Sequence, residues 1–296
     1  MTEALEEFFK LTRDRVEGKS EGQVRHWQND RRRAVRYFVE AAGDLPLADI
    51  ARPEALKFRA WWQARIEAKG GDPETANKSL GHVADVHSTV SDLLALGLDN
   101  PFRGLRLKAR LHRKKVPPFS VEFLRAKLLA PGALDRMNEE ARDALLVMVN
   151  TGARPSEIVG ALPEDFRVLD NLPHLAVLPR PGRSLKTAQS EREIPLVGVS
   201  LEAARRIVAR GGFSRYFLKG DGWSAAVNKF LREKGLLETD DHTAYSLRHA
   251  FEDRLLEQGT DDRLRAELMG HKYSRPAYGR GGSLAIKARA VEGIAL

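Results

Sequence analysis

Arg154 lies in a segment whose residue types suit the binding of a phosphate. An apolar helix pattern over residues 144–149 is stopped by Gly152, and Pro155 suits the first turn of a new helix. A cation at a helix N-terminus opposes the helix dipole. The arrangement becomes favourable if an anion lies between them, because backbone N–H groups and a guanidinium can converge on one phosphate. A pair with Glu157, or simple solvation, is the alternative.

Arg248 repeats this arrangement. Residues 245–251 (YSLRHAF) begin a helix that Ser246 can cap, and Arg248 falls in its first turn. A further helix is expected over 261–269 with Thr260 as its cap, and Gly270 ends it just before His271.

The whole chain has the composition of a globular protein. Its 296 residues suffice for two domains, with 42% hydrophobic and 30% charged residues. The absence of Cys excludes disulfides, thiolate catalysis and zinc fingers of the Cys type. No transmembrane run or signal peptide is apparent, which favours a cytoplasmic location.

The positive charge is concentrated between two predicted domains. The net charge of +8 points to a polyanionic partner. Residues 103–118 form a linker that ends in Pro-Pro, between a helical domain over 1–102 and a second domain over 119–296. Such charge runs are often only solvated, but a linker that crosses a DNA backbone needs this charge. The candidate DNA-binding residues of the linker are Arg103, Arg106, Lys108, Arg110, Arg113, Lys114 and Lys115.

The first domain reads as helices over 25–42 and 55–68, with a third that begins at Asp72-Pro73. Trp61 and Trp62 are expected in the core and not in a base-stacking platform. The first turns of the third helix carry short polar and basic side chains that suit phosphates or base edges, although a solvated helix start is an equal alternative. These are Thr75, Asn77 and Lys78.

The second domain mixes helices with strand patterns. Lys186 lies near the hairpin between the last two predicted strands. Asp253 and Arg254 are expected to form a surface pair. The predicted strands cover residues 166–169, 174–179 and 191–196, and the predicted helices cover 121–129, 139–150, 201–210 and 224–233.

Four segments, in this order, resemble the tyrosine recombinase family of phage-type integrases. They are TGARPSEI, SLKTAQSEREIPL, YSLRHAF and LMGHKYSRPAYG, and they span roughly residues 145–280. The resemblance implies a mainly α fold with a small antiparallel β-sheet, in which a helical core-binding domain precedes the catalytic domain.

The resemblance also assigns roles by position. Tyr278 would be the nucleophile, and Arg154 and Arg248 would hold the non-bridging oxygens of the scissile phosphate. Lys186 would be the general acid for the leaving 5′ oxygen, and His271 would assist proton transfer.

One position departs from the family pattern. Tyr245 stands where the family often has His, and a neutral phenol offers one donor and not an imidazolium. Its acid–base role is therefore open. Tyr273 is a rival nucleophile that is disfavoured because it lies so close to His271, and His249 is expected to be structural.

This set of residues matches the needs of phosphodiester chemistry. Covalent strand opening requires a nucleophile, charge neutralisation on the phosphoryl oxygens and a proton for the leaving oxygen. A phosphotyrosine stores the energy of the broken bond, so no metal, ATP or other cofactor is expected. The predicted function is a site-specific DNA recombinase. A DNA-binding protein without catalysis and a monomeric type IB-like topoisomerase are the alternatives.

The expected partners are double-stranded DNA, other copies of the chain in a homotetramer on paired sites, and accessory DNA-bending proteins, with no membrane. The expected location is the nucleoid of a bacterial host.

Residues 283–296 keep helical spacing after Gly281-Gly282, and Ser283 can cap them. We expect this tail to pack on a neighbouring subunit, with docking on its own domain as the alternative.

Overall fold

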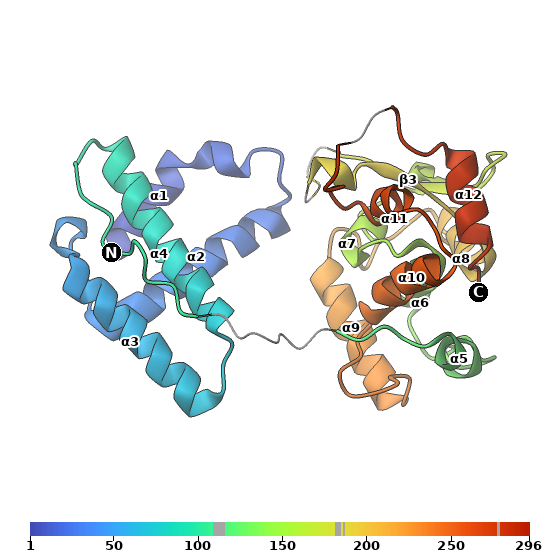
Figure 1. Ribbon diagram of the computed structural model, residues 1–296, viewed down its shortest axis with the longest axis horizontal. Helices are drawn as coiled ribbons and strands as arrows, with labels where there is room; N and C mark the ends of the chain where they lie inside the picture. The colour runs from blue at the N-terminus through green and yellow to red at the C-terminus, as the bar shows by residue number, and fades with distance from the viewer. Residues whose placement is uncertain (109–115, 181–184, 186, 277–278) are drawn as a thin grey trace. The chain divides into compact units, whose positions relative to one another are not determined.

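The computed structural model describes residues 1–108, 116–180, 185, 187–276 and 279–296. Its contacts divide the chain into two compact units, Met1–Lys114 and Lys115–Leu296 (Figure 1).

The first unit is a bundle of helices whose ends follow local capping chemistry. Ser20 and Gln23 form a capping box, so the second helix begins four residues earlier than the sequence predicted. Asp72 caps the last helix, with proline at its first position as predicted. The helices are α1 (Thr2–Leu11), α2 (Glu21–Ala42), α3 (Arg52–Lys69) and α4 (Pro73–Leu93), with 3-10 turns at Arg13–Val16 and Leu47–Asp49.

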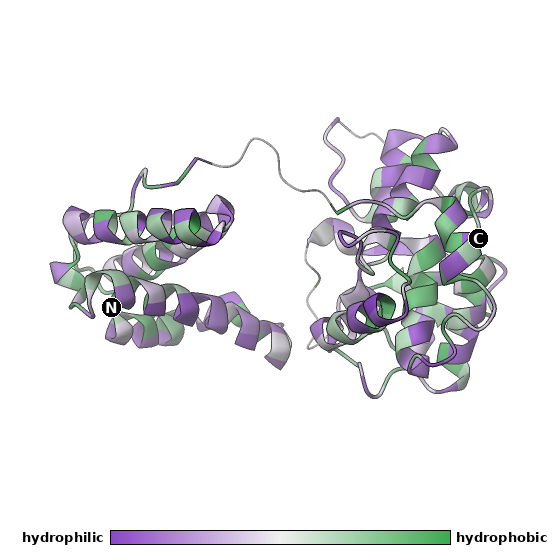
Figure 2. Cartoon of the chain, turned by 90° about the horizontal axis from the view of Figure 1, so that it is seen from below, coloured by the Kyte–Doolittle hydropathy of each residue, from purple (hydrophilic) through white to green (hydrophobic). Residues whose placement is uncertain are grey.

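Aromatic side chains fill the core of this unit. Phe8, Phe38 and Phe58 are fully buried, and the apolar faces of the helices turn toward one another (Figure 2). The rings of Trp61 and Trp62 meet edge to face with centroids 5.2 Å apart, and both pack in or against this core. The prediction that these two residues are core residues is confirmed.

The start of the predicted linker packs on the first unit. Leu105 and Leu107 are buried in its core, while Arg106 and Lys108 between and after them are exposed. The side-chain amide of Asn77 donates to the carbonyl of Leu107 (3.0 Å) and accepts from its N–H (2.7 Å). Leu105 and Leu107, in the first part of the predicted linker, therefore belong to the core of this unit.

In the second unit, α6 (Glu139–Thr151) packs against four other helices, α7 to α10, and a three-stranded sheet packs against helices α8, α11 and α12 (Figure 1). The strands run antiparallel in the order β1-β2-β3, with Leu175 opposite Ile194. The predicted mainly helical fold with a small antiparallel sheet is confirmed. The strands are β1 (Phe166–Arg167), β2 (His174–Val177) and β3 (Arg192–Pro195); the helices are α5 (Val121–Phe123), followed by a π-helical turn (Leu124–Leu128), α6 (Glu139–Thr151), α7 (Pro155–Ile158), α8 (Gly198–Ala209), α9 (Gly220–Glu233), α10 (Ser246–Glu257), α11 (Asp262–Met269) and α12 (Leu284–Glu292), with 3-10 turns at Pro163–Asp165 and Ala188–Ser190.

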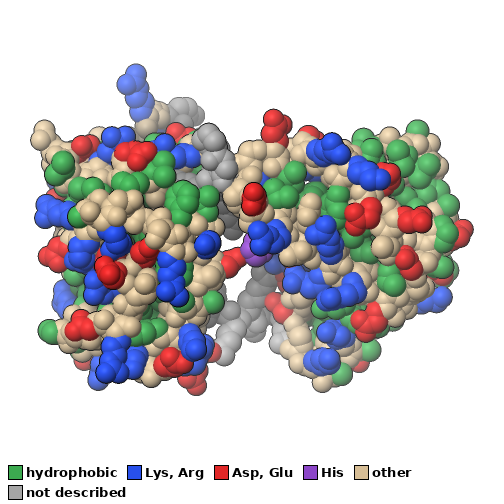
Figure 3. Space-filling model, turned by 180° about the vertical axis from the view of Figure 1, so that it is seen from behind, with side chains coloured by type: hydrophobic (Ala, Val, Ile, Leu, Met, Phe, Trp, Pro, Cys, Tyr) green, Lys and Arg blue, Asp and Glu red, His purple; other side chains and the backbone are tan. Residues whose placement is uncertain are grey.

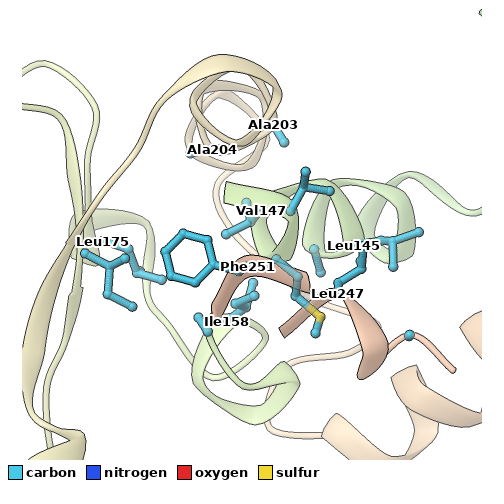
Figure 4. Close-up of a cluster of buried hydrophobic side chains, with 14 of the residues drawn as sticks. Leu145, Val147, Ile158, Leu175, Ala203, Ala204, Leu247 and Phe251 are labelled. Atoms are coloured by element: carbon cyan, nitrogen blue, oxygen red, sulfur yellow. The ribbon is translucent and has the colours of Figure 1, made fainter. Parts of the chain in front are cut away.

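Phe251 is central to the core of the second unit. Figure 4 shows its ring between Leu175 of β2 and Ile158 of α7. Gly152 ends α6 in the left-handed conformation (φ 56°), and a Cβ there would lie 2.4 Å from Cδ1 of Phe251. Only glycine permits both the turn and this close approach.

In this single chain the tail docks on its own unit, which is the alternative that the sequence analysis gave to packing on a neighbouring subunit. Ser283 caps α12 as predicted, and α12 contacts β3. The side chain of Asn150 pairs with both the N–H (3.1 Å) and the carbonyl (2.8 Å) of Leu296. Buried Val291 places the apolar side of α12 in the core of the second unit.

Arg254 is buried, so the predicted surface pair with Asp253 is wrong. Its guanidinium donates to the Asn150 side chain (3.1 Å) and to the carbonyls of Ile294 (2.6 Å) and Val149. Arg254 thereby ties the tail to the end of α6.

Within the described part of the chain, no helix combines the length and apolar character that a membrane span requires.

Candidate active site

The candidate site is built from the ends of four helices of the second unit, the N-terminal ends of α7 and α10 and the C-terminal ends of α6 and α11. Arg154 is the N-cap residue of α7, as predicted. Its guanidinium donates to Oε1 of Glu157 (2.6 Å), to Oγ of Ser190 (3.4 Å) and to the carbonyl of Gly270 (3.4 Å). The pair with Glu157, which the sequence left as an alternative, is therefore formed. The contact with Gly270 also brings Arg154 to the turn that precedes His271.

Arg248 lies in the first turn of α10, as predicted, and its side chain is only 2% exposed. It donates to the carbonyl of Gly152 at the end of α6 and to that of Met269 at the end of α11. Burial, and then the charge of Arg154, lower the pKa of Arg248 to about 10, which leaves it cationic at neutral pH. Ser246 begins α10 and accepts from the N–H of Thr243 instead of capping the helix.

His271 lies against Arg248. Its Nε2 is 3.0 Å from a guanidinium nitrogen of Arg248, which has only protons to donate, so Nε2 is the acceptor. Partial burial and the charge of Arg248 lower the pKa of His271. The ring is therefore a neutral imidazole near pH 7. Asp261 caps the preceding helix α11 in place of the predicted Thr260, because its carboxylate accepts from two N–H groups of the first turn.

Sequence reasoning missed Arg192, which faces the core from β3. Its guanidinium donates to both carboxylate oxygens of Glu157, at 3.1 and 2.9 Å. Burial opposes ionisation of Glu157, but hydrogen bonds from Arg192 and Arg154 outweigh it and lower the pKa of the carboxyl to about 2. A signal for Arg192 was available, since it shares an inward strand face with Ile194 and Leu196.

The structure describes only some of the other catalytic candidates. Tyr245 is exposed, and its ring lies edge-on to that of His249 with centroids 5.6 Å apart. Tyr273 is partly buried in the segment after His271. Lys186 and Tyr278 lie outside the described residues.

The candidate DNA-binding residues also divide into groups. Thr75 and Lys78 are exposed in the first turns of α4, but Asn77 is buried and its amide is used by Leu107. Its side chain is thus not presented to a ligand, which corrects that prediction. The exposed candidates of the next segment are Arg103, Arg106 and Lys108. The remaining candidates, Arg110, Arg113, Lys114 and Lys115, lie outside the described residues.

Comparison with known proteins gives a consistent result. Residues 129–276, half of the chain, match the model of the phage integrase family. The tyrosine recombinase XerC of Agrobacterium fabrum is 28% identical over 266 residues, which cover 84% of this chain and 79% of that protein. The transposase from transposon Tn916 of Enterococcus faecalis is 27% identical over 283 residues, 82% of this chain and 69% of that protein.

Solved structures share the fold. A lambda integrase dimer bound to a COC′ core site superposes with a TM-score of 0.63 at 17% identity, over 93% of this chain and 75% of that one. The Tn1549 transposon integrase in complex with a circular intermediate DNA gives a TM-score of 0.62 at 17% identity, over 97% and 94% of the two chains.

These findings test the resemblance in the sequence. The four matching segments fall within or next to the residues that the family model covers, and the predicted activity of a tyrosine-type site-specific DNA recombinase is confirmed. The relatives include a tyrosine recombinase and the transposase of a transposon. The chain belongs to the phage integrase family of tyrosine recombinases.

Proposed function

We propose that this recombinase cuts and rejoins duplex DNA through a covalent 3′-phosphotyrosine at Tyr278. The observation that carries the proposal is the convergence of Arg154, Arg248 and His271 on the turn at residues 269–271. Two guanidinium groups beside a neutral imidazole suit a phosphate whose negative charge grows during the reaction.

The proposed step exchanges one phosphate ester for another. The Tyr278 oxygen attacks phosphorus while the bond to the 5′ oxygen breaks, and that oxygen takes a proton from Lys186. When the phosphate replaces Nε2 of His271 as the partner of Arg248, that nitrogen becomes free to accept the tyrosine proton. Arg154 and Arg248 neutralise the non-bridging oxygens, a contribution of about 3–4 kcal/mol for each donor lost in comparable sites. The reverse exchange reseals the strand without an external energy source.

DNA is the inferred partner. Exposed Thr75, Lys78, Arg103, Arg106 and Lys108 supply donors and positive charge in the first unit, and phosphate contacts of this kind position a protein on a duplex. A tetramer on paired sites would follow the lambda integrase, which has been solved as a tetramer bound to a Holliday junction. We also propose that the protein acts on DNA of the bacterial nucleoid and that accessory DNA-bending proteins assist it.

The test uses a nicked duplex that carries a core site selected from random sequences by binding to the full chain. A denaturing gel then detects the covalent protein–DNA adduct. Tyr278→Phe should abolish the adduct and leave DNA affinity nearly unchanged, because it removes only the nucleophilic oxygen. Tyr273→Phe is the matched control and should keep the adduct. If Tyr278→Phe retains the adduct and Tyr273→Phe loses it, the assignment of the nucleophile is wrong.

A further inference from the structure

Arg192 is buried among charged and polar groups of the site, yet it lies behind the residues that would meet the phosphate. Its side chain is 3% exposed. Besides the two bonds to Glu157, its Nε donates to the carbonyl of Leu268 (2.8 Å) and its Nη1 to that of Ser190 (2.7 Å). Every nitrogen of this guanidinium is therefore used within the protein.

The carboxylate of Glu157 connects Arg192 to Arg154. Its Oε1 accepts from both guanidinium groups, at 2.6 Å from Arg154 and 3.1 Å from Arg192. Its Oε2 accepts from Arg192 (2.9 Å) and from the backbone N–H of Arg154 (2.8 Å). One carboxylate thus holds the backbone and the side chain of Arg154, and Arg192 holds the carboxylate.

Arg192 also supports the turn that carries His271. Its bond to Leu268 fixes the last turn of α11, and the next turn passes directly over its guanidinium. Gly270 adopts a left-handed conformation (φ 62°), and a Cβ at this position would lie 2.8 Å from Nη1 of Arg192. A side chain at residue 270 would therefore displace either the turn or the guanidinium.

We propose that Arg192 is a positioning residue that sets Arg154 and the 268–271 turn in one fixed arrangement for the phosphate. The inference rests on the proposed function, in which Arg154 and His271 act on that phosphate. Because Arg192 is present, the carboxylate of Glu157 is shared between two guanidinium groups, those of Arg192 and Arg154. Without it, the carboxylate would be free to take both donors of Arg154 in a bidentate pair, and Arg154 would lose donors for the phosphate.

Arg192→Lys is the informative substitution. Lysine keeps the positive charge beside Glu157, but it lacks the planar fork that reaches two carboxylate oxygens and a carbonyl together. Misplacement of a catalytic group by about 1 Å lowers rates by about 100-fold. We expect covalent adduct formation on the nicked duplex to slow by about 10- to 100-fold in single turnovers, while the dissociation constant for DNA changes by less than about twofold.

Arg206→Lys is the matched control. Arg206 also pairs with a fully buried carboxylate, that of Asp143 at 2.8 Å, on the helix α8. Arg206 is 40% exposed and Arg210 also binds Asp143, so the substitution should cost less stability than Arg192→Lys, and it should leave the rate of adduct formation unchanged. A wild-type rate in Arg192→Lys, or an equal loss of rate in both variants, would overturn the positioning role.

A double-mutant cycle tests the route through Arg154. If Arg192 acts through Arg154, then Arg192→Lys should have little further effect on the rate in an Arg154→Lys background. Additive losses would show that Arg192 acts by another route.

Nuclear magnetic resonance of ¹⁵N-labelled arginine side chains separates this inference from the proposed function. The guanidinium signal of Arg154, assigned by its loss in Arg154→Lys, should shift and exchange faster with solvent in Arg192→Lys than in Arg206→Lys. A wild-type chain that forms no adduct would refute the proposed chemistry, and the NMR comparison would still decide the positioning. An Arg154 signal that is the same in Arg192→Lys as in the wild type would refute the positioning role of Arg192.

Discussion

At the scale of residues, the site is a cluster of like charges packed around the buried carboxylate of Glu157. The pKa of Arg248 is lowered in part by the positive charges of its neighbours Arg154 and Arg192. Glu157 is 5% exposed and accepts from two of these arginines. A phosphate would supply the further negative charge that the cluster lacks, which is why we read it as a phosphate site.

The ionisation of Glu157 should make the stability of the second unit depend on pH. The pKa of its carboxyl is about 2 in the folded protein against 4.5 ordinarily. Its contribution is therefore complete above about pH 4.5 and is lost as the pH falls toward 2, and the difference corresponds to on the order of 3 kcal/mol. The melting temperatures of the wild type and Glu157→Gln should differ most near pH 7, and the difference should shrink as the pH falls below about 4.5 toward 2.

The control for this measurement is Glu233→Gln, which changes an exposed carboxylate on α9. Its melting temperature should follow that of the wild type at every pH. A gap between the wild type and Glu157→Gln that stays constant from pH 7 to pH 3 would contradict the shifted pKa.

At the scale of elements, helix ends place the side chains of the candidate site. The C-terminal ends of α6 and α11 offer carbonyls to Arg248, while α7 and α10 carry Arg154 and Arg248 at their N-terminal ends. The tail packs against this same C-terminal end of α6, where Asn150 binds Leu296 and Arg254 binds Ile294. Residues 283–296 thus complete the core of the unit that holds the site.

Arg254→Met should destabilise the second unit. The substitution leaves the carbonyls of Val149 and Ile294 without their buried donor, at a cost of about 1–3 kcal/mol for each unsatisfied group. We expect a melting temperature several degrees lower in calorimetry and faster cleavage of the tail by a protease. Arg205→Met, at an exposed position of α8, is the control and should melt like the wild type. A normal melting temperature and a protected tail in Arg254→Met would contradict the docking that we describe.

At the scale of the whole molecule, the excess of positive charge is not spread evenly. On the face that Figure 3 shows, Lys and Arg side chains alternate with Asp and Glu over both units. The sequence instead concentrates seven cations and no acid within residues 103–115. This short stretch accounts for most of the net charge of +8.

Neutralising Arg113, Lys114 and Lys115 together should weaken DNA binding on all sequences alike. Each lost phosphate contact should reduce the dependence of log affinity on log salt concentration by about 0.9. Affinities from 50 to 300 mM salt, measured on the selected core site and on an unrelated duplex, test this. Arg103→Gln alone, at an exposed position of the described segment, should reduce the slope by no more than one such step. An unchanged slope in the triple variant would mean that these residues are only solvated.

Short-range chemistry determined much of the architecture. Gly152 and Gly270 end helices in the left-handed conformation, and Asp72-Pro73 begins one, because these residues act on the backbone next to them. The positions of Arg154 and Arg248 at helix N-termini follow from the same local signals. The four family motifs are short contiguous segments, so they can be read directly from the sequence. The protein family and its chemistry could therefore be predicted without a structure.

Tertiary packing decided what each polar side chain touches. Asn77 meets a residue 30 positions away, Arg254 meets one 40 positions away, and Asn150 meets the end of the chain 146 positions away. No local pattern specifies such partners, because they are set by which apolar faces close over one another and by the need of buried polar groups for hydrogen bonds. The burial of Arg254, the docked tail and the pairing of Arg192 with Glu157 became visible only when the fold brought these distant segments together.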